Sequence, residues 1–538
     1  MASRYTERPT RPRSCLPSEP AVAITGRCVH RNAGMEKTLI DDRLRRDMIR
    51  KHIDIDLTME ILEGLNSGHL SPASSIQTTG VPAVDGKSLL SLVGDFVYRV
   101  DASEAKTRFA AYGHAWPADT PVKNGMAALD RATLADFGER LYEVSAWGVL
   151  NGGSASSYAD RKKNGSLGAG VFEAIREGFE TLAPLCEGLP KGLSPAYLNP
   201  DGSVGESFLV LKMRSALLKA ERYRKRFGAP DRPALPFFQM TSRGTDEQLR
   251  AAYSSYRNHP WLSGLIDQTG TDPTRPWSAV QPLIAAFTHS TKGTPRRVFD
   301  SAYGKPHSAL ALPGGHGQSF RFLADVYGGL LEAGYRFAYI GNVDNVGYSV
   351  DPVEIAILCL SGAEAAFDFS YRTPVDVKGG ILVLDEGGRM TIGDLGQAIA
   401  IDEAEAMEAR GERILFNCAT GLFNLEALVP KLDAIASRLP LRLSDQDKDA
   451  GRYSQAEQST WEVLGLLDRP IGFAVNKADR FLAAKLLAET ILGSGAADLK
   501  ALPPEVAATA QSLSHGLAKT LAGTCDLALR KGRWTAAG

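Results

Sequence analysis

Between about residues 141 and 490, short apolar segments alternate with amphipathic helical patterns, and this alternation limits the possible fold more than any other feature. The segment PFFQMTS precedes the helical pattern DEQLRAAYSSYRNHPWL, and FAYIG lies shortly before VEIAILCL. Strands that alternate with helices are typical of a doubly wound α/β sheet. We therefore predict an α/β core over residues 141–490.

The regions on either side of this core have a different character. A chain of 538 residues is too long for one compact core and suggests two or three domains. Residues 1–34 are rich in Arg, Pro and Ser without apolar periodicity, which predicts a disordered extension, and whether they belong to the native protein stays open because Met35 follows. Residues 35–140 predict an N-terminal helical lobe, and residues 491–538 predict a short helical tail.

Charge and cysteine usage exclude several classes of protein. The net charge of −1 gives no sign of a nucleic-acid surface, so any basic site must be a local pocket. The six cysteines are scattered without CxxC spacing or His partners for a metal site, which argues against a zinc site or a disulfide framework. No apolar run has transmembrane length and no signal peptide is recognisable. We expect a cytoplasmic protein with no nucleic-acid or membrane partner.

A cluster of polar residues follows the strand predicted at FAYIG. Asn342, Asp344 and Asn345 lie within four positions. In open α/β sheets ligands bind beyond the carboxyl ends of the strands, where a carboxylate can hold a divalent cation against phosphate oxygens. Asp344 is therefore a candidate metal ligand, and the alternative is an Asx turn that ends the strand.

Two glycine-rich segments offer close backbone approach to a ligand. In VLNGGSASSYADRKKNGS, residues 149–166, Gly152 and Gly153 end a predicted strand and a basic run follows; the alternative is an ordinary loop with solvated lysines. In PGGHGQ, Gly315 and Gly317 flank His316 before a helix, which suits an anion; the alternative is a glycine-rich turn with a surface histidine.

Two further segments carry lysines. The segment DVKGG places Lys378 at the entry to a predicted strand, where a surface salt bridge is the alternative. The segment NKADRFLAAKLL places Arg480 and Lys485 on either side of an apolar stretch, and Lys485 could equally extend into solvent.

Taken in order, these segments resemble the UTP:glucose-1-phosphate uridylyltransferase (UDP-glucose pyrophosphorylase) family, in its eukaryotic-type branch. The matching motifs are LNGG at 150–153, MTS at 240–242, GHG at 315–317, NVDNVG at 342–347, DVKGG at 376–380, FN at 416–417 and RF-x-x-x-K at 480–485. The MTS segment is closer to the UDP-N-acetylhexosamine and broader UDP-sugar pyrophosphorylases of the same superfamily.

This resemblance implies a glycosyltransferase-A-like mixed sheet flanked by helices and a nucleotidyltransferase reaction. The sugar 1-phosphate oxygen would attack the α-phosphorus of UTP and pyrophosphate would leave, with one Mg²⁺ neutralising charge. UTP and a sugar 1-phosphate would be the partners, and UDP-glucose the favoured product.

The resemblance also implies roles for individual residues. Lys485 would be the catalytic phosphate-binding lysine and Asp344 the metal ligand. The nucleotide would contact Leu150, Asn151, Gly152, Gly153, His289 and Gly315. The sugar phosphate would contact His316, Asn342, Val343, Asn417 and Lys378.

The chain departs from the family in four places. The family loop LNGGLGTTMG and its following Pro-Lys pair are replaced by LNGGSASSYADRKKN, so Lys162 or Lys163 would supply the loop lysine, and we prefer Lys163. His289 in FTHSTKGTPR stands at the family's uracil-reading glutamine. The FN segment continues as CATGLF. The C-terminal β-helix is missing, so the family's oligomeric state does not transfer.

Three functions therefore remain open. The favoured one is an active uridylyltransferase that uses glucose 1-phosphate. A catalytically weak relative could instead bind nucleotide or sugar phosphate as a sensor or scaffold, or the chain could be a UDP-N-acetylhexosamine or UDP-sugar pyrophosphorylase. The sequence does not choose the sugar, because one or two side chains read a hydroxyl epimer.

Overall fold

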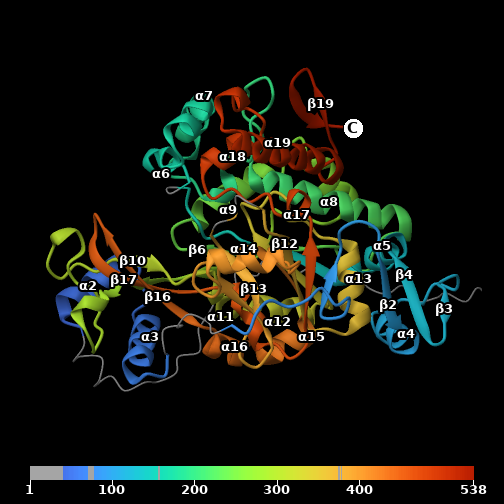
Figure 1. The fold of residues 1–538 in the computed structure, drawn as a ribbon, viewed down its shortest axis with the longest axis horizontal. Helices are drawn as coiled ribbons and strands as arrows, with labels where there is room; N and C mark the ends of the chain where they lie inside the picture. Colours follow the sequence, from blue (N-terminus) through green and yellow to red (C-terminus); the bar gives the residue numbers. More distant parts are fainter. Residues whose placement is uncertain (1–39, 71–77, 156–157, 374–375, 377, 538) are drawn as a thin grey trace, which may run out of the picture. The chain divides into compact units, whose positions relative to one another are not determined.

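The computed structural model describes residues 40–70, 78–155, 158–373, 376 and 378–537, so the extension predicted over residues 1–34 lies outside the described residues. From Asp42 onward the chain groups into one compact unit, drawn in Figure 1. At its centre is a mixed β-sheet of ten strands with helices on both faces, which confirms the predicted α/β class.

The strand order fixes which loops meet. Along the sheet the strands run β1 (Leu89–Ser91), β18 (Pro470–Val475), β12 (Ala365–Tyr371), β15 (Leu415–Asn424), β11 (Phe337–Asn342), β5 (Ser145–Leu150), β6 (Phe237–Ser242) and β7 (Trp277–Gln281). Neighbours pair in parallel, except that β15 is antiparallel to both β11 and β12. The hairpin β13 (Gly380–Leu384) and β14 (Met390–Asp394) extends from β15.

The register aligns the carboxyl ends of three neighbouring strands, β11, β5 and β6. We call this side of the sheet, where the strands end, the sheet edge. Asn342 of β11 pairs with Leu150 of β5, and Leu150 pairs with Met240 of β6. The polar segments that follow these strands therefore begin side by side, as expected for a ligand site in an open α/β sheet.

Alternating side chains build a separate apolar core on each face of the sheet. Trp147 and Tyr339 point to the face covered by α5 (Arg131–Arg140), α8 (Phe208–Phe227) and α13 (Pro352–Ser361), whereas Ala146 and Ile340 point to the face covered by α12 (Ala324–Glu332) and α16 (Leu432–Arg438). Because each strand is buried on both faces, its sequence reads as a continuous apolar run.

The N-terminal region contains strands as well as helices. The described helices before residue 140 are α2 (Asp42–Arg50), α3 (Ile55–Ser67), α4 (Ala102–Ala111) and α5. Between them β2 (Val97–Asp101), β4 (Met126–Asp130) and β3 (Val122–Lys123) form a three-stranded antiparallel sheet. A mainly helical pattern was expected there, and strands this short leave too little periodicity to be recognised.

The C-terminal region also combines both kinds of structure. The helices α18 (Leu487–Gly493) and α19 (Pro504–Lys519) lead through a π-helical turn, Thr520–Thr524, into the hairpin β19 (Leu527–Arg530) and β20 (Arg533–Ala536). These elements lie in the upper part of Figure 1 together with α6 (Arg161–Gly165) and α7 (Ala169–Cys186). Cys186, Cys359, Cys418 and Cys525 are buried free thiols.

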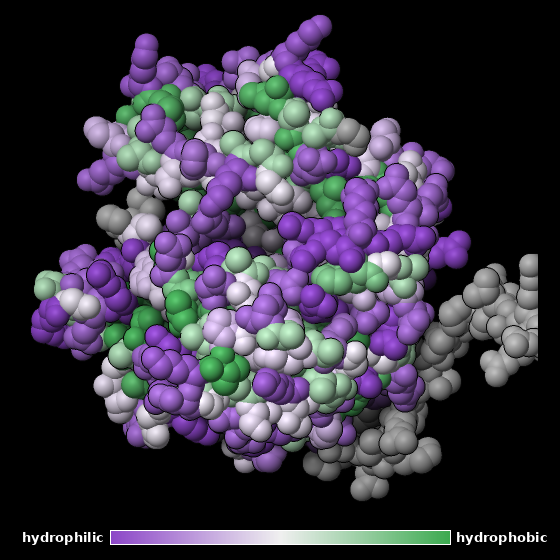
Figure 2. All heavy atoms as spheres, turned by 90° about the vertical axis from the view of Figure 1, so that its right-hand side faces the viewer, coloured by the Kyte–Doolittle hydropathy of each residue, from purple (hydrophilic) through white to green (hydrophobic). Residues whose placement is uncertain are grey.

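One face of the molecule is mainly polar. On the face drawn in Figure 2 hydrophilic side chains predominate, and hydrophobic ones occur in small groups. None of the described helices combines the length and the apolar character needed to span a bilayer.

Candidate active site

The site begins where β5, β6 and β11 end. The backbone N–H of Asn151 donates to the carbonyl of Met240 at 2.8 Å, and that of Val343 donates to the carbonyl of Leu150 at 3.4 Å. These bonds continue the sheet by one residue at each strand. The loops carrying Gly152 and Asp344 therefore leave the sheet next to each other.

Asp344 is paired with a lysine that the sequence analysis did not single out. The carboxylate of Asp344 accepts a hydrogen bond from Nζ of Lys191 at 2.5 Å, and their side chains are only 15% and 13% exposed. The backbone N–H of Lys191 donates to the carbonyl of Gly153 at 3.0 Å. A carboxylate, a cation and the glycine loop thus meet at one point of the sheet edge.

The chain makes a long excursion between Ala155 and Leu189 before it returns to this loop. Ser154 bridges to Pro190, and the N–H of Ala155 donates to the carbonyl of Leu189 at 2.9 Å. We name residues 155–189 the excursion; it contains α6 and α7. The N–H of Ala155 is thereby satisfied within the protein and is not directed at a ligand.

Lys163 therefore does not occupy the place that the sequence analysis gave it. Lys162 and Lys163 lie on α6 with exposed side chains, and the N–H of Lys163 donates to the cap residue Asp160 at 2.8 Å. The lysine beside the glycine loop is Lys191, preceded by Pro190. The Pro-Lys pair is visible in the sequence, but the excursion separates it from the glycine loop, and no local pattern shows that the two meet.

Asn345 joins the Asp344 loop to the segment that carries Lys485. Its Oδ1 accepts from the N–H of Leu482 at 2.9 Å, and its Nδ2 donates to the carbonyl of Arg480 at 3.0 Å. The N–H of Ala484 donates to the carbonyl of Asp344 at 3.3 Å. Lys485 follows Ala484 directly, so its backbone lies next to the Asp344 loop. Its side chain is exposed.

Arg480 attaches the segment that carries Lys485 to the core. Its guanidinium pairs with Asp368 at 2.7 Å and with Glu354 at 3.0 Å, and all three side chains are buried. Burial raises the pKa of both carboxyls, and the charge of Arg480 opposes that rise. Arg480 is thus fixed in the core.

His316 is held as a neutral hydrogen-bond donor. Its Nδ1 accepts from the backbone N–H of Thr460 at 3.0 Å, so in the neutral ring the proton sits on Nε2. Burial lowers the pKa of His316 to about 4, although the charge of Asp344 acts to raise it. The ring therefore stays uncharged near neutral pH and retains one N–H for a ligand.

Gly315 has both a conformation and a neighbour that require glycine. Its φ is +82°, and a Cβ at this position would lie 2.4 Å from the carbonyl oxygen of Gln458. Its own carbonyl accepts from Nε2 of Gln281, at the end of β7, at 2.7 Å. The loop that presents His316 is therefore fixed to the sheet edge.

Of the predicted sugar contacts, Asn417 lies on β15, and Lys378 lies just before the neighbouring strand β13. Antiparallel pairing of β15 with β11 reaches Gly341 opposite Thr420, so Asn417 lies further along β15 toward the Asp344 loop. Its side-chain oxygen accepts from the N–H of Ala419 at 2.8 Å. Lys378 is exposed and precedes β13, whose Ile381 pairs with Phe416.

His289 lies apart from these residues. It follows β9 (Phe287–Thr288), which pairs with Tyr453 and Ser454 of β17 (Gly451–Gln458), whereas Gln458 at the other end of β17 bonds to Gly314. Five residues of strand separate the two places by roughly 16 Å. His289 also approaches Asp445, with Nε2 and Oδ2 3.8 Å apart.

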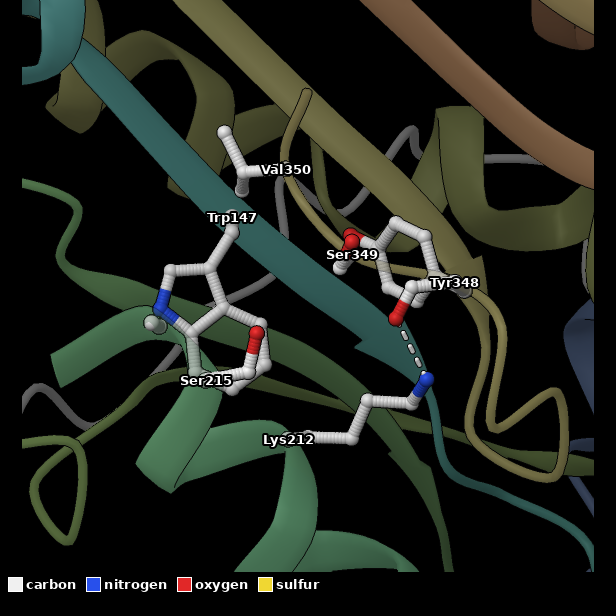
Figure 3. A pocket seen from close by; sticks show the side chains of 7 residues that line it. Trp147, Lys212, Ser215, Tyr348, Ser349 and Val350 are labelled. Carbon is white, nitrogen blue, oxygen red and sulfur yellow. Dashed lines mark hydrogen bonds between the residues drawn. The ribbon is translucent and has the colours of Figure 1, made fainter. Parts of the chain in front are cut away.

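A buried lysine donates hydrogen bonds to the backbone of the Asp344 loop. Lys212 reaches from α8 to the carbonyl of Tyr348 at 2.6 Å, beside a small cavity (Figure 3), and also donates to the carbonyl of Asn345. Its Nζ lies 4.8 Å from the centre of the Tyr348 ring. Burial lowers the pKa of Lys212 to about 7. The sequence analysis missed it, although a lysine within the apolar run FLVLKM was a visible signal.

The donor set around Asp344 limits which metal fits. Among the described residues, no group of three or more His, Cys, Asp or Glu side chains could hold a metal ion. One partly exposed carboxylate beside a glycine loop matches the way Mg²⁺ binds, through one or two carboxylates together with substrate phosphates and water. The residues present therefore fit a magnesium ion that arrives with a phosphate ligand.

Comparisons with known proteins find one family by sequence. The family model of UTP--glucose-1-phosphate uridylyltransferase matches residues 296–495. The enzyme of that name from Musa acuminata is 28% identical over 218 residues, covering 39% of this chain and 46% of the relative. The one from Solanum tuberosum is 26% identical over 182 residues, covering 34% and 38%. The chain thus spans less than half the length of these curated relatives.

Solved structures show the same fold. UDP-glucose phosphorylase from Trypanosoma brucei superposes with a TM-score of 0.50 at 17% identity, covering 82% of this chain and 75% of that one. A mutant UDP-glucose pyrophosphorylase from Leishmania major, in complex with UDP-glucose, gives a TM-score of 0.50 at 15% identity, covering 84% and 77%.

Proposed function

We propose that this chain, whose residues 296–495 match the UTP--glucose-1-phosphate uridylyltransferase family, joins UTP and a sugar 1-phosphate to give a UDP-sugar and pyrophosphate. Glucose 1-phosphate is the favoured sugar phosphate. The observation that carries this proposal is the meeting of Asp344, Lys191 and the Gly152-Gly153 loop at the sheet edge.

The reaction needs positioning and charge stabilisation more than covalent chemistry from the protein. An oxygen of the sugar 1-phosphate attacks the α-phosphorus of UTP in line with the leaving pyrophosphate. Bound Mg²⁺ would neutralise charge on the phosphate oxygens, and Asp344 would hold it. Lys191 would exchange its contact with Asp344 for a phosphate oxygen, and Lys485 would approach from the neighbouring segment.

The remaining residues bind and orient the substrates in this proposal. Backbone groups of residues 150–153 and of Gly315 cradle the nucleotide, because glycine permits close approach. Nε2–H of His316 donates to the sugar phosphate. Asn342, Val343, Asn417 and Lys378 line the side where the sugar would lie.

Two assignments change from those made on sequence. We propose Lys191 as the loop lysine in place of Lys163, because it contacts both Gly153 and Asp344. We leave His289 out of the proposed site, because it lies at the far end of β17 from Gly314. A cytoplasmic location remains our proposal and agrees with the four buried free thiols.

A pyrophosphate-release assay tests the function directly. Purified protein is incubated with UTP, Mg²⁺ and a panel that includes the 1-phosphates of glucose, galactose and N-acetylglucosamine. We expect Mg²⁺-dependent release that is fastest with glucose 1-phosphate. Fastest release with the N-acetylglucosamine compound would identify the alternative pyrophosphorylase. No release with any sugar, together with measurable UTP binding by calorimetry, would support a sensor instead.

A further inference from the structure

Lys191 also contacts a tyrosine of the excursion. Its Nζ lies 5.0 Å from the centre of the Tyr158 ring, while the same ammonium pairs with Asp344. Tyr158 is only 1% exposed. A cation over a buried aromatic face is attracted by the electron density of the ring, and desolvation strengthens the attraction. The ring therefore favours one position of the ammonium.

The other end of Tyr158 is tied to the segment of the second lysine. Its hydroxyl lies 2.5 Å from Oγ1 of Thr490 in α18, and its carbonyl accepts from the N–H of Leu487, the first residue of α18, at 3.0 Å. Lys485 lies two residues before that helix begins. Tyr158 thus links the Lys191 ammonium to the Lys485 segment, through its ring and hydroxyl and through its backbone carbonyl.

Asn164 completes this connection. Its Nδ2 donates to the carbonyl of Tyr158 at 2.9 Å, and its Oδ1 accepts from the N–H of Ala488 at 2.8 Å. The first N–H groups of a helix lack partners within the helix, so the excursion supplies two acceptors that the start of α18 needs. The residues after Lys485 are thus bonded to Tyr158 and Asn164. The residues before it are bonded to the Asp344 loop.

We propose that Tyr158 is a positioning residue that sets Lys191, and through α18 Lys485, relative to Asp344. This inference rests on the proposed function, because it assigns both lysines to the phosphates of the substrates. It gives the excursion a role in the reaction, although no side chain of the excursion need touch the substrate.

Reactivity of Lys191 tests the contact without any substrate. Competitive labelling with an amine-acylating reagent, read residue by residue by mass spectrometry, compares wild type with Tyr158→Leu and Tyr158→Phe. Loss of the ring in Tyr158→Leu should raise the labelling rate of Lys191 severalfold, whereas Tyr158→Phe, the matched control that keeps the ring, should leave it near wild type. Equal rates in wild type and Tyr158→Leu would overturn the proposal.

Kinetics test the consequence for the reaction. Tyr158→Leu should lower kcat about tenfold with little change in the KM for UTP, because a misplaced cation acts mainly in the transition state. In a Lys191→Met background the same substitution should have a smaller further effect, because only the link through α18 to Lys485 remains. Independent, additive losses in the double variant would show that Tyr158 acts only through general packing.

The two proposals fail in different ways. If wild type releases no pyrophosphate with any sugar 1-phosphate, the proposed function is wrong, whereas the labelling result still decides whether Tyr158 positions Lys191. Melting temperatures are measured for every variant. If Tyr158→Leu does not unfold cooperatively, Tyr158→Met, which retains more side-chain volume, takes its place in both assays.

Discussion

Asp344 is the residue on which the proposed metal site depends, and replacing its charge should remove metal-dependent turnover. Asp344→Asn keeps the shape of the side chain but lacks the carboxylate charge that Mg²⁺ and Lys191 require. We expect kcat to fall on the order of a hundredfold or more and the melting temperature to change little. Mg²⁺ titration in the presence of UTP checks the first expectation and thermal unfolding the second.

The matched control for this variant is Asp479→Asn. Asp479 pairs with Lys519 at the surface, at 2.7 Å, where a single ion pair contributes little. Its turnover and Mg²⁺ dependence should equal those of wild type. Full activity in Asp344→Asn would remove Asp344 from the metal site.

The identity of the loop lysine separates the structural assignment from the one made on sequence. Lys191→Met should lower kcat about a hundredfold, because it removes a cation from the proposed phosphate site. Lys163→Met changes an exposed side chain of α6 and should stay within about twofold of wild type. Steady-state kinetics of the two variants measured in parallel decide the matter, and a larger loss in Lys163→Met would restore the earlier assignment.

His316 gives stability a defined dependence on pH. Its pKa of about 4 in the folded state lies below the ordinary value of 6.5, because burial disfavours the charged ring. Between these values the unfolded chain binds a proton that the folded chain does not, so the free energy of unfolding decreases as pH falls from about 6.5 to 4 and is unaffected by this group above that window.

Urea unfolding of wild type and His316→Gln at pH 7.5 and at pH 5 measures this contribution. Wild type should lose up to about 1.4 kcal/mol per pH unit more than the variant within the window. His69→Gln, at an exposed histidine, serves as the control and should follow wild type. Parallel pH profiles for wild type and His316→Gln would contradict the expectation.

At the scale of elements, the sequence predicts where the buried strands end. It does not predict that the chain comes back to the glycine loop after the excursion. PFFQMTS and FAYIG correspond to β6 and β11, because strands covered on both faces must be apolar throughout. Residues 149–166 look like one phosphate loop in sequence, yet the chain departs at Ala155 and returns at Leu189. No local pattern encodes where a loop returns, so Lys191 could not be placed from the sequence alone.

The segment from Arg480 to Lys485 depends on a buried charge cluster. Arg480→Met would leave the carboxyls of Asp368 and Glu354 buried without their cation. Breaking a buried ion pair by removing one partner costs about 3–5 kcal/mol. We expect a loss of that size in the free energy of unfolding at pH 7, measured in urea. The loss should shrink in acid, because protonated carboxyls no longer need the cation.

Arg389→Met is the control for this substitution. Arg389 pairs with Asp385 at 2.9 Å, but its side chain is 64% exposed, so the loss should be below about 1 kcal/mol. Similar losses in the two variants would show that the buried cluster does not stabilise the segment.

At the scale of the whole molecule, the alternation of apolar segments with helical patterns predicted the α/β class but not how the C-terminal region packs on the core. The helical tail expected over residues 491–538 includes α19, yet the last residues form the hairpin β19–β20. Each strand of this hairpin has four residues, too few for a clear alternation. The structure shows what the sequence does not, that the chain from Cys525 onward contacts α8.

Arg214 of α8 makes the C-terminal segment part of the core. Its buried guanidinium donates to the carbonyl of Cys525 at 2.6 Å, to that of Asp526 at 3.2 Å and to that of Trp261 at 2.9 Å. Deleting residues 525–538 would remove two of these acceptors and leave a buried charge under-satisfied. We expect the free energy of unfolding to fall by about 3 kcal/mol or more, because a buried charge without its partners carries its full desolvation cost.

The opposite terminus provides the comparison. Deleting residues 1–34, whose composition predicts disorder, should leave both the melting temperature and turnover unchanged. Thermal unfolding of the two truncated chains beside the full chain checks both expectations. If the chain without residues 525–538 melts at the same temperature as the full chain, Arg214 finds other acceptors. Arg214→Met should then leave the melting temperature unchanged as well. A large loss after removal of residues 1–34 would instead show that the N-terminal extension packs on the core.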